Sequence, residues 1–170
     1  MFCGVARHEG RRKLYIIDVW RGKWKLPDLV KNLKAYWEKY KYLRTKTFRR
    51  RGATKALIED KGHGTALIQT CRDEKEAKKR VPVVDVQRSI SKLQRAIPCL
   101  PILEAGDVML PECANELSNA QWVPEFVKEI TEFNELMTHT NDDQCDVLFD
   151  AIEKLLLGSM SIWQAMSTKK

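Results

Sequence analysis

Apolar side chains in the first part of the chain form two short runs and then a helical spacing. Residues 2–7 are mostly apolar, and residues 13–20 (KLYIIDVW) are rich in β-branched and aromatic side chains, with the glycine-containing segment HEGRR between them. This pattern predicts an antiparallel hairpin. After Pro27 the apolar residues recur four positions apart, which predicts an amphipathic helix that ends near residue 41.

The middle of the chain alternates between strand-like and helix-like segments. Residues 54–59 (TKALIE) and 81–86 (VPVVDV) are expected to form strands, with helices at about 65–74 and 89–97. Residues 103–110 (LEAGDVML) suggest a tight hairpin or strand that turns at Gly106, and residues 122–133 a helix. The order β-β-α-β-α-β-α, followed by a β element and two helices, predicts an α/β domain with a mixed sheet flanked by helices.

The last predicted helix, over residues 142–157, begins with a group of acids. Asp142, Asp146 and Asp150 are four positions apart and therefore share one side of the helix, with Asp143 beside them and Asn141 as the expected N-cap. The buried face is expected to hold Val147, Leu148, Ala151, Ile152, Leu155 and Leu156. Acids are also favoured near a helix N-terminus by the helix dipole, so this pattern alone does not require a ligand.

A second pair of acids, Glu59 and Asp60, lies at the carboxyl end of the predicted strand at 54–59. Ligands bind at the carboxyl ends of strands in open α/β sheets, and Gly62 and Gly64 would let the backbone approach closely. The alternative is a pair of solvated acids, one of them paired to Lys61. Together, the two acidic segments suggest a two-metal centre, because Mg²⁺ and Mn²⁺ prefer carboxylate oxygens and water.

Composition limits the class of protein. Hydrophobic residues make up 44% and charged residues 31% of the 170 positions, as in globular proteins, and no apolar run is long enough to cross a membrane. The N-terminus does not resemble a signal peptide, and the five cysteines form no CxxC pair, so a reducing cytoplasm fits best. No phosphate loop of the GxxxxGK[ST] type is present.

The net charge of +7 favours a polyanionic partner. The basic residues gather in three clusters, any one of which could instead be a solvated surface. The clusters are Arg44, Lys46, Arg49, Arg50 and Arg51; Lys75, Lys78, Lys79 and Arg80; and Arg88, Lys92 and Arg95. Basic residues beside carboxylates would suit a metal-dependent nuclease, because cations would hold the DNA phosphates and carboxylates the metals.

The order and spacing of five segments resemble the C-terminal nuclease domain of the large terminase subunit of tailed bacteriophages. The segments are LYIIDVWRGKW at 14–24, LIEDKGHGTALI at 57–68, SKLQRA at 91–96, LEAGDVMLP at 103–111 and NDDQCD at 141–146. The resemblance implies a ribonuclease H-like fold, with a nuclease domain over 1–157 and a tail over 158–170. It also implies endonucleolytic cleavage of concatemeric viral DNA in the cytoplasm of a bacterial host.

The resemblance further implies roles for particular residues. Glu59, with Asp60 as the alternative, and Asp142 and Asp143 would bind two Mg²⁺ or Mn²⁺ ions, and Asp146 would support them. Lys92 and Arg95 match a basic segment of the family that would contact DNA phosphate or lie near the site. Three arginines of the first basic cluster are also expected to contact DNA, namely Arg49, Arg50 and Arg51. The implied partners are double-stranded DNA, the terminase ATPase half, the small terminase subunit and the portal, and no membrane.

The resemblance also predicts one difference. The family's first catalytic aspartate lies on a strand before the hairpin, and this sequence begins at the hairpin, so we expect that strand to be missing. Asp18 is expected to be structural, Glu9 lies in a turn, and His139 stands near a family histidine without matching it. The alternatives are a catalytically inactive module for DNA binding or assembly, and another ribonuclease H-like nuclease of the resolvase or transposase type.

Overall fold

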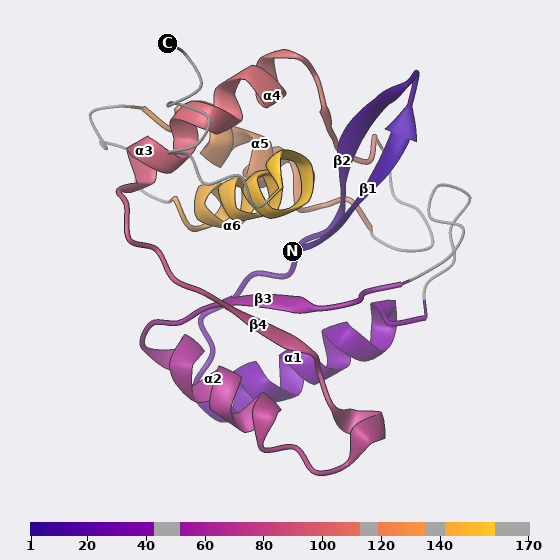
Figure 1. Ribbon diagram of the computed structural model, residues 1–170, viewed down its shortest axis with the longest axis vertical. Helices are drawn as coiled ribbons and strands as arrows, with labels where there is room; N and C mark the ends of the chain where they lie inside the picture. Colours follow the sequence, from indigo (N-terminus) through magenta and orange to yellow (C-terminus); the bar gives the residue numbers. More distant parts are fainter. Residues whose placement is uncertain (43–51, 113–118, 135–141, 159–170) are drawn as a thin grey trace. The chain divides into compact units, whose positions relative to one another are not determined.

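The computed structural model describes residues 1–42, 52–112, 119–134 and 142–158. The chain divides into two compact units (Figure 1). The first unit combines residues 1–20 with the described residues from 90 onward, and the second consists of residues 21–89. The chain therefore leaves the first unit after one hairpin and returns to it for the helices that carry the acidic segment.

The first unit contains a three-stranded mixed sheet in the order β1-β2-β5. Strands β1 (Phe2–His8) and β2 (Arg11–Asp18) are antiparallel, as the sequence predicts, and the turn between them has positive φ at Glu9 and Gly10. Strand β5 (Val108–Met109) pairs with β2 in parallel, which is the non-local pairing that makes the sheet mixed.

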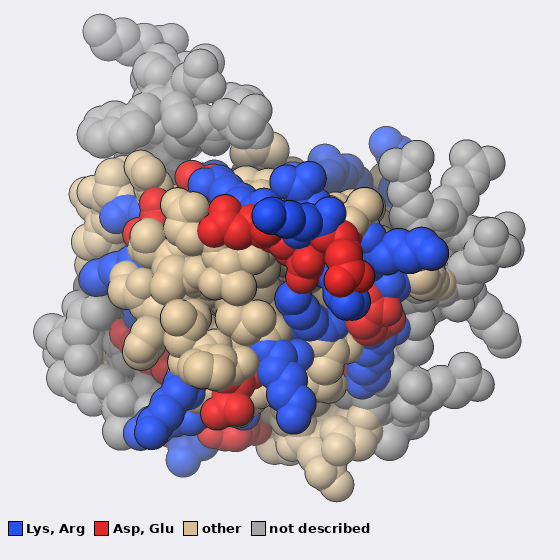
Figure 2. Space-filling view, turned by 90° about the horizontal axis from the view of Figure 1, so that it is seen from below, with Lys and Arg blue, Asp and Glu red and all other residues tan. Residues whose placement is uncertain are grey.

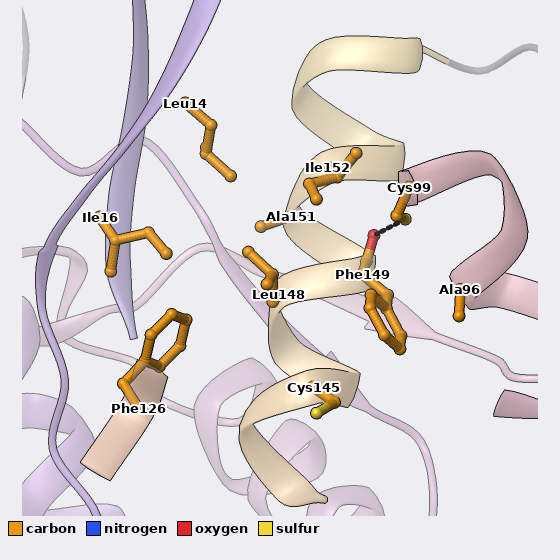
Figure 3. Packing of buried hydrophobic residues seen from close by; sticks show 10 residues of the cluster. All are labelled: Leu14, Ile16, Ala96, Cys99, Phe126, Cys145, Leu148, Phe149, Ala151 and Ile152. Atoms are coloured by element: carbon orange, nitrogen blue, oxygen red, sulfur yellow. Dashed lines mark hydrogen bonds between the residues drawn. The ribbon is translucent and has the colours of Figure 1, made fainter. Parts of the chain in front are cut away.

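Helices of the first unit pack against this sheet around one hydrophobic core (Figure 3). Leu14 and Ile16 of β2 contribute to this core together with the buried face of the last helix, from which Leu148 and Ile152 are fully buried. The helical elements are α3 (Lys92–Ala96), η2 (Ile97–Cys99), α4 (Leu100–Glu104), α5 (Val123–Glu132), α6 (Asp143–Ile152) and the π-helical turn η3 (Glu153–Leu157).

Two expectations for this unit need correction. Of the two alternatives for residues 103–110, the strand is confirmed and the hairpin is wrong. Gly106, at φ 65°, turns the chain before the short strand β5, and the residues before that turn end helix α4, whose first turn contains Pro101. Val147 is not buried in the core but is 40% exposed, because it lies one turn after the exposed Asp143 on the outer side of α6.

The second unit is built around a parallel pair of strands, β3 (Ala56–Glu59) and β4 (Val83–Val86), connected through α2 (His63–Arg72). The short turn η1 (Ala77–Lys79) precedes β4, and the longest helix, α1 (Leu26–Tyr40), completes the unit. Leu67 and Cys71 of α2 form its core with Val81, and apolar residues of α1 pack against them. These elements agree with the predicted ones to within a few residues.

The mixed α/β arrangement that the sequence predicts is therefore confirmed. Within the described ranges, no helix is both long enough and apolar enough to span a membrane. Part of the predicted 158–170 tail, the segment 159–170, lies outside the described residues, as does the basic cluster at Arg49, Arg50 and Arg51.

Candidate functional site

The N-terminal turn of α6 carries the acids that the sequence analysis singled out. Asp142 occupies the N-cap position, which had been expected for Asn141, a residue outside the described ranges. The Asp142 side chain makes no capping hydrogen bond. Asp143 opens the helix and is exposed, whereas Asp150, two turns on from Asp142, is buried. The buried face of α6, anchored by Cys145 and Leu148, fixes which way the acids point.

Lys92 of α3 binds two of these acids at once. Its Nζ atom lies 2.5 Å from Asp142 Oδ2 and 2.9 Å from Asp146 Oδ2. It also donates to the Asp142 carbonyl oxygen at 3.3 Å. Burial alone would lower the pKa of Lys92, but the hydrogen bonds and charges of Asp142 and Asp146 outweigh burial, so the pKa lies above its ordinary value. Lys92 is therefore a permanent cation at the start of α6.

Arg95, one turn later on α3, binds the next acids along α6. Its Nη2 atom pairs with Asp146 Oδ1, and its Nη1 atom lies 3.3 Å from Asp150 Oδ1. Arg95 is only 6% exposed. The three acids on this side of α6 are thus paired with two cations of α3. A contact between Arg95 and a DNA phosphate would require it to leave these carboxylates.

The main-chain start of α6 is held by a residue that the sequence analysis missed. Glu129 of α5 accepts a hydrogen bond from the Gln144 backbone N–H at 2.6 Å and from Gln144 Nε2 at 2.8 Å. Glu129 is only 4% exposed. The sequence contains one indication of this role. Glu129 falls within the apolar stripe that Phe126 and Ile130 establish on α5, where an acid needs buried partners.

The acids of the second unit follow β3. Glu59 lies at the strand end, and its Oε2 atom pairs with Arg88 Nη1 at 2.7 Å. Asp60 is exposed; its backbone N–H donates to the Val86 carbonyl and its Oδ1 atom accepts from Thr65 Oγ1 at 2.7 Å. The partners are thus Arg88 and Thr65, rather than the Lys61 that the alternative interpretation proposed.

Two glycines shape the turn between Glu59 and helix α2. Gly62 takes φ 56° at the N-cap position, in the left-handed region that favours glycine. At Gly64 a Cβ atom would lie 1.9 Å from the Glu59 carbonyl oxygen. The absence of a side chain at Gly64 therefore allows the first turn of α2 to approach the strand end directly.

Asp18, for which the sequence predicts a structural role, is buried at the end of the hairpin. It ends β2, is 4% exposed, and accepts a hydrogen bond from Trp20 Nε1 at 3.0 Å. Glu9 lies in the hairpin turn, whereas His139 lies outside the described residues.

Among the described residues, charges of both signs are interleaved on the face that Figure 2 shows. Among the residues that the structure describes, no three His, Cys, Asp or Glu side chains are gathered so as to hold a metal ion. Asp142 and Asp146 nevertheless direct one oxygen each at a single cationic nitrogen. Their oxygens are the donor type that Mg²⁺ and Mn²⁺ prefer, so this pair fits a hard cation chemically.

Comparison with known protein families relates most of the chain to one of them. The family model described as the terminase RNaseH-like domain matches residues 14–155. That range includes both acidic segments and the helix with Lys92 and Arg95. No curated protein and no solved structure matches the chain.

Proposed function

Since the chain belongs to the terminase RNaseH-like domain family, we propose that it cleaves double-stranded viral DNA during genome packaging, using Mg²⁺ or Mn²⁺. The proposal assigns the metal-binding role to Glu59, with Asp60 as its alternative, and to Asp142 and Asp143, with Asp146 in support. The terminase ATPase half, the small terminase subunit and the portal are its proposed partners.

The observation that carries the proposal is the convergence of Asp142 and Asp146 on one cation position at the start of α6. Bound Mg²⁺ or Mn²⁺ ions would supply Lewis acids and an activated water for phosphodiester hydrolysis. The chain itself contributes carboxylates on a rigid helix, whose first turn is fixed by Glu129. Asp143 is exposed beside them, which suits a residue that must reach a metal ion or a substrate.

DNA binding is proposed to depend mainly on phosphate contacts. Lys92 and Arg95 are proposed to supply positive charge for these contacts, and Arg49, Arg50 and Arg51 are proposed to add to it. Because phosphate contacts release counterions from DNA, binding should weaken steeply as the salt concentration rises.

Cleavage of supercoiled plasmid with Mn²⁺ tests this function. We expect wild-type protein to nick and linearise the plasmid, chelation to stop the reaction, and Asp142→Asn to abolish it. Asp85→Asn is the matched control, because Asp85 is an acid on β4 that pairs with Arg72 at 2.6 Å outside the proposed site.

The same assay separates the proposal from its alternatives. Salt-dependent DNA binding without cleavage, unchanged by chelation or by Asp142→Asn, would instead indicate a catalytically inactive module for binding or assembly. Cleavage confined to branched DNA or to specific ends would indicate a nuclease of the resolvase or transposase type.

A further inference from the structure

The Lys92 ammonium group occupies the place where the carboxylates of Asp142 and Asp146 converge. Its contacts, 2.5 Å and 2.9 Å to one oxygen of each acid, use the oxygens that would face a shared cation. The Lys92 side chain is 13% exposed and those of Asp142 and Asp146 are 30% and 15% exposed, so the group is partly screened from water but not sealed.

Lys92 and Arg95 differ in how firmly they are held. Arg95 is fixed by two acids through separate nitrogens and lies within the packing between α3 and α6. Lys92 lies at the first position of α3, next to the Ser91 capping box, and reaches the acids through a flexible four-carbon chain. The ammonium group of Lys92 can therefore move away without disturbing the Arg95 pairs.

We propose that Lys92 is a built-in counter-ion that holds the place of a divalent metal ion between Asp142 and Asp146, and that the metal ion binds by displacing it. This inference rests on the proposed metal-dependent function. The two carboxylates would be costly to bring together without a cation, and Lys92 supplies that cation while the metal is absent. On displacement, its positive charge becomes available to an anionic group.

DNA phosphate is the anion that this exchange favours. When the metal ion takes the carboxylates, the released ammonium group lies near the metal site and needs a new partner. A phosphate that binds Lys92 stabilises the displaced state, so metal and DNA each raise the affinity of the site for the other. Lys92 thus couples metal binding to DNA binding, as a positioning residue rather than a catalytic one.

Mn²⁺ binding to the full chain, measured by calorimetry and by loss of the free-ion paramagnetic resonance signal, tests the inference. We expect Lys92→Gln and Lys92→Met to bind Mn²⁺ about tenfold or more tightly than wild type, because a competing positive charge has been removed. Lys92→Met retains the aliphatic length of the side chain, which protects the test against loss of packing. Lys34→Gln is the matched control, because Lys34 pairs with Glu74 at 2.7 Å in the second unit; its affinity should equal that of wild type.

The second measurement is Mn²⁺ affinity in the presence of short duplex DNA, which phosphorothioate linkages protect from cleavage. This DNA is added to each variant. It should raise the Mn²⁺ affinity of wild type and of Lys34→Gln, and raise that of Lys92→Gln much less. If wild type binds Mn²⁺ and both Lys92 variants bind it equally or more weakly, the counter-ion role is wrong while the proposed function stands. If neither wild type nor the Lys92 variants bind Mn²⁺, the counter-ion role and the proposed metal-dependent function are both wrong.

Discussion

At the scale of single residues, the acidic side of α6 is a set of ion pairs. Its sequence spacing predicts correctly that Asp142, Asp146 and Asp150 share one side of the helix. Spacing does not predict that Lys92 and Arg95 bind these acids, since that depends on how α3 packs against α6. The local pattern thus gives the positions of the charges, whereas tertiary packing determines their partners.

Arg95→Ala is expected to lower the free energy of unfolding by about 3–5 kcal/mol, because it leaves Asp146 and the buried Asp150 without this cation. Urea denaturation measures the change. Lys128→Ala should stay within about 0.5 kcal/mol of wild type, since Lys128 pairs with Glu132 on the surface. Equal effects of the two substitutions would show that the Arg95 network does not stabilise the fold.

Glu129→Ala is expected to cost about 1–3 kcal/mol, because the Gln144 backbone N–H loses its buried acceptor. Hydrogen exchange should speed up first at Gln144 and the neighbouring amides of α6. Glu132→Ala, an exposed acid on the same helix, provides the control. Unchanged exchange at Gln144 in the Glu129 variant would contradict the capping role.

At the scale of elements, the sequence predicts most strands and helices but misplaces a few boundaries. The hairpin, α1, α2 and α5 follow from hydrophobic spacing, since each buries one face. Helix α4 was missed because Pro101 suggests a break in the chain, whereas in the structure it occupies the first turn of the helix, where proline is tolerated. The pairing of β5 with β2 is non-local, and no local pattern encodes it.

The β3–α2 turn offers a test at this scale. Gly64→Ala should destabilise the protein by about 3 kcal/mol or more, because its Cβ would lie 1.9 Å from the Glu59 carbonyl oxygen and the backbone must move. Gly62→Ala should cost about 1–3 kcal/mol, since its Cβ meets no atom within 4 Å and the cost comes only from the positive-φ backbone conformation. Thermal unfolding of the two variants checks the order, and a milder effect at Gly64 would be inconsistent with this close approach.

At the scale of the whole molecule, the predicted α/β class is confirmed, as is the resemblance to the terminase nuclease family. The hydrophobic pattern does not predict the division into two compact units, because the first unit is built from two separate stretches of chain. Assignment of the metal ligands likewise depends on the order of the segments that resemble the family. An acid at a helix start or a strand end also occurs for structural reasons that involve no metal ion.

Buried thiols make the stability of the whole fold sensitive to alkaline pH. Burial raises the pKa of Cys3 to about 11 and that of Cys99 to about 12, from an ordinary value of 9.0. A folded-state pKa above the unfolded one gives stability that is complete below pH 9 and is lost as the pH rises toward the folded pKa. Urea denaturation at increasing pH should therefore show stability falling above pH 9.

Substitution of one thiol provides the control for that prediction. In Cys99→Ala the free energy of unfolding should fall less steeply above pH 9, by up to about 1.4 kcal/mol per pH unit, although the variant starts from a lower stability. A slope identical to that of wild type would show that Cys99 titrates normally in the folded protein.

The central claim is that carboxylates after β3 and at the start of α6 both serve metal-dependent DNA cleavage. The rate at which supercoiled plasmid is nicked in Mn²⁺ tests it most directly, with Glu59→Gln and Asp143→Asn compared with wild type and Asp85→Asn. We predict that each of the first two substitutions slows nicking about 100-fold or more, as expected when several kcal/mol of metal-derived stabilisation is lost, while Asp85→Asn matches wild type. Nicking at the wild-type rate by either acid variant, or nicking that persists in chelator, would contradict the account.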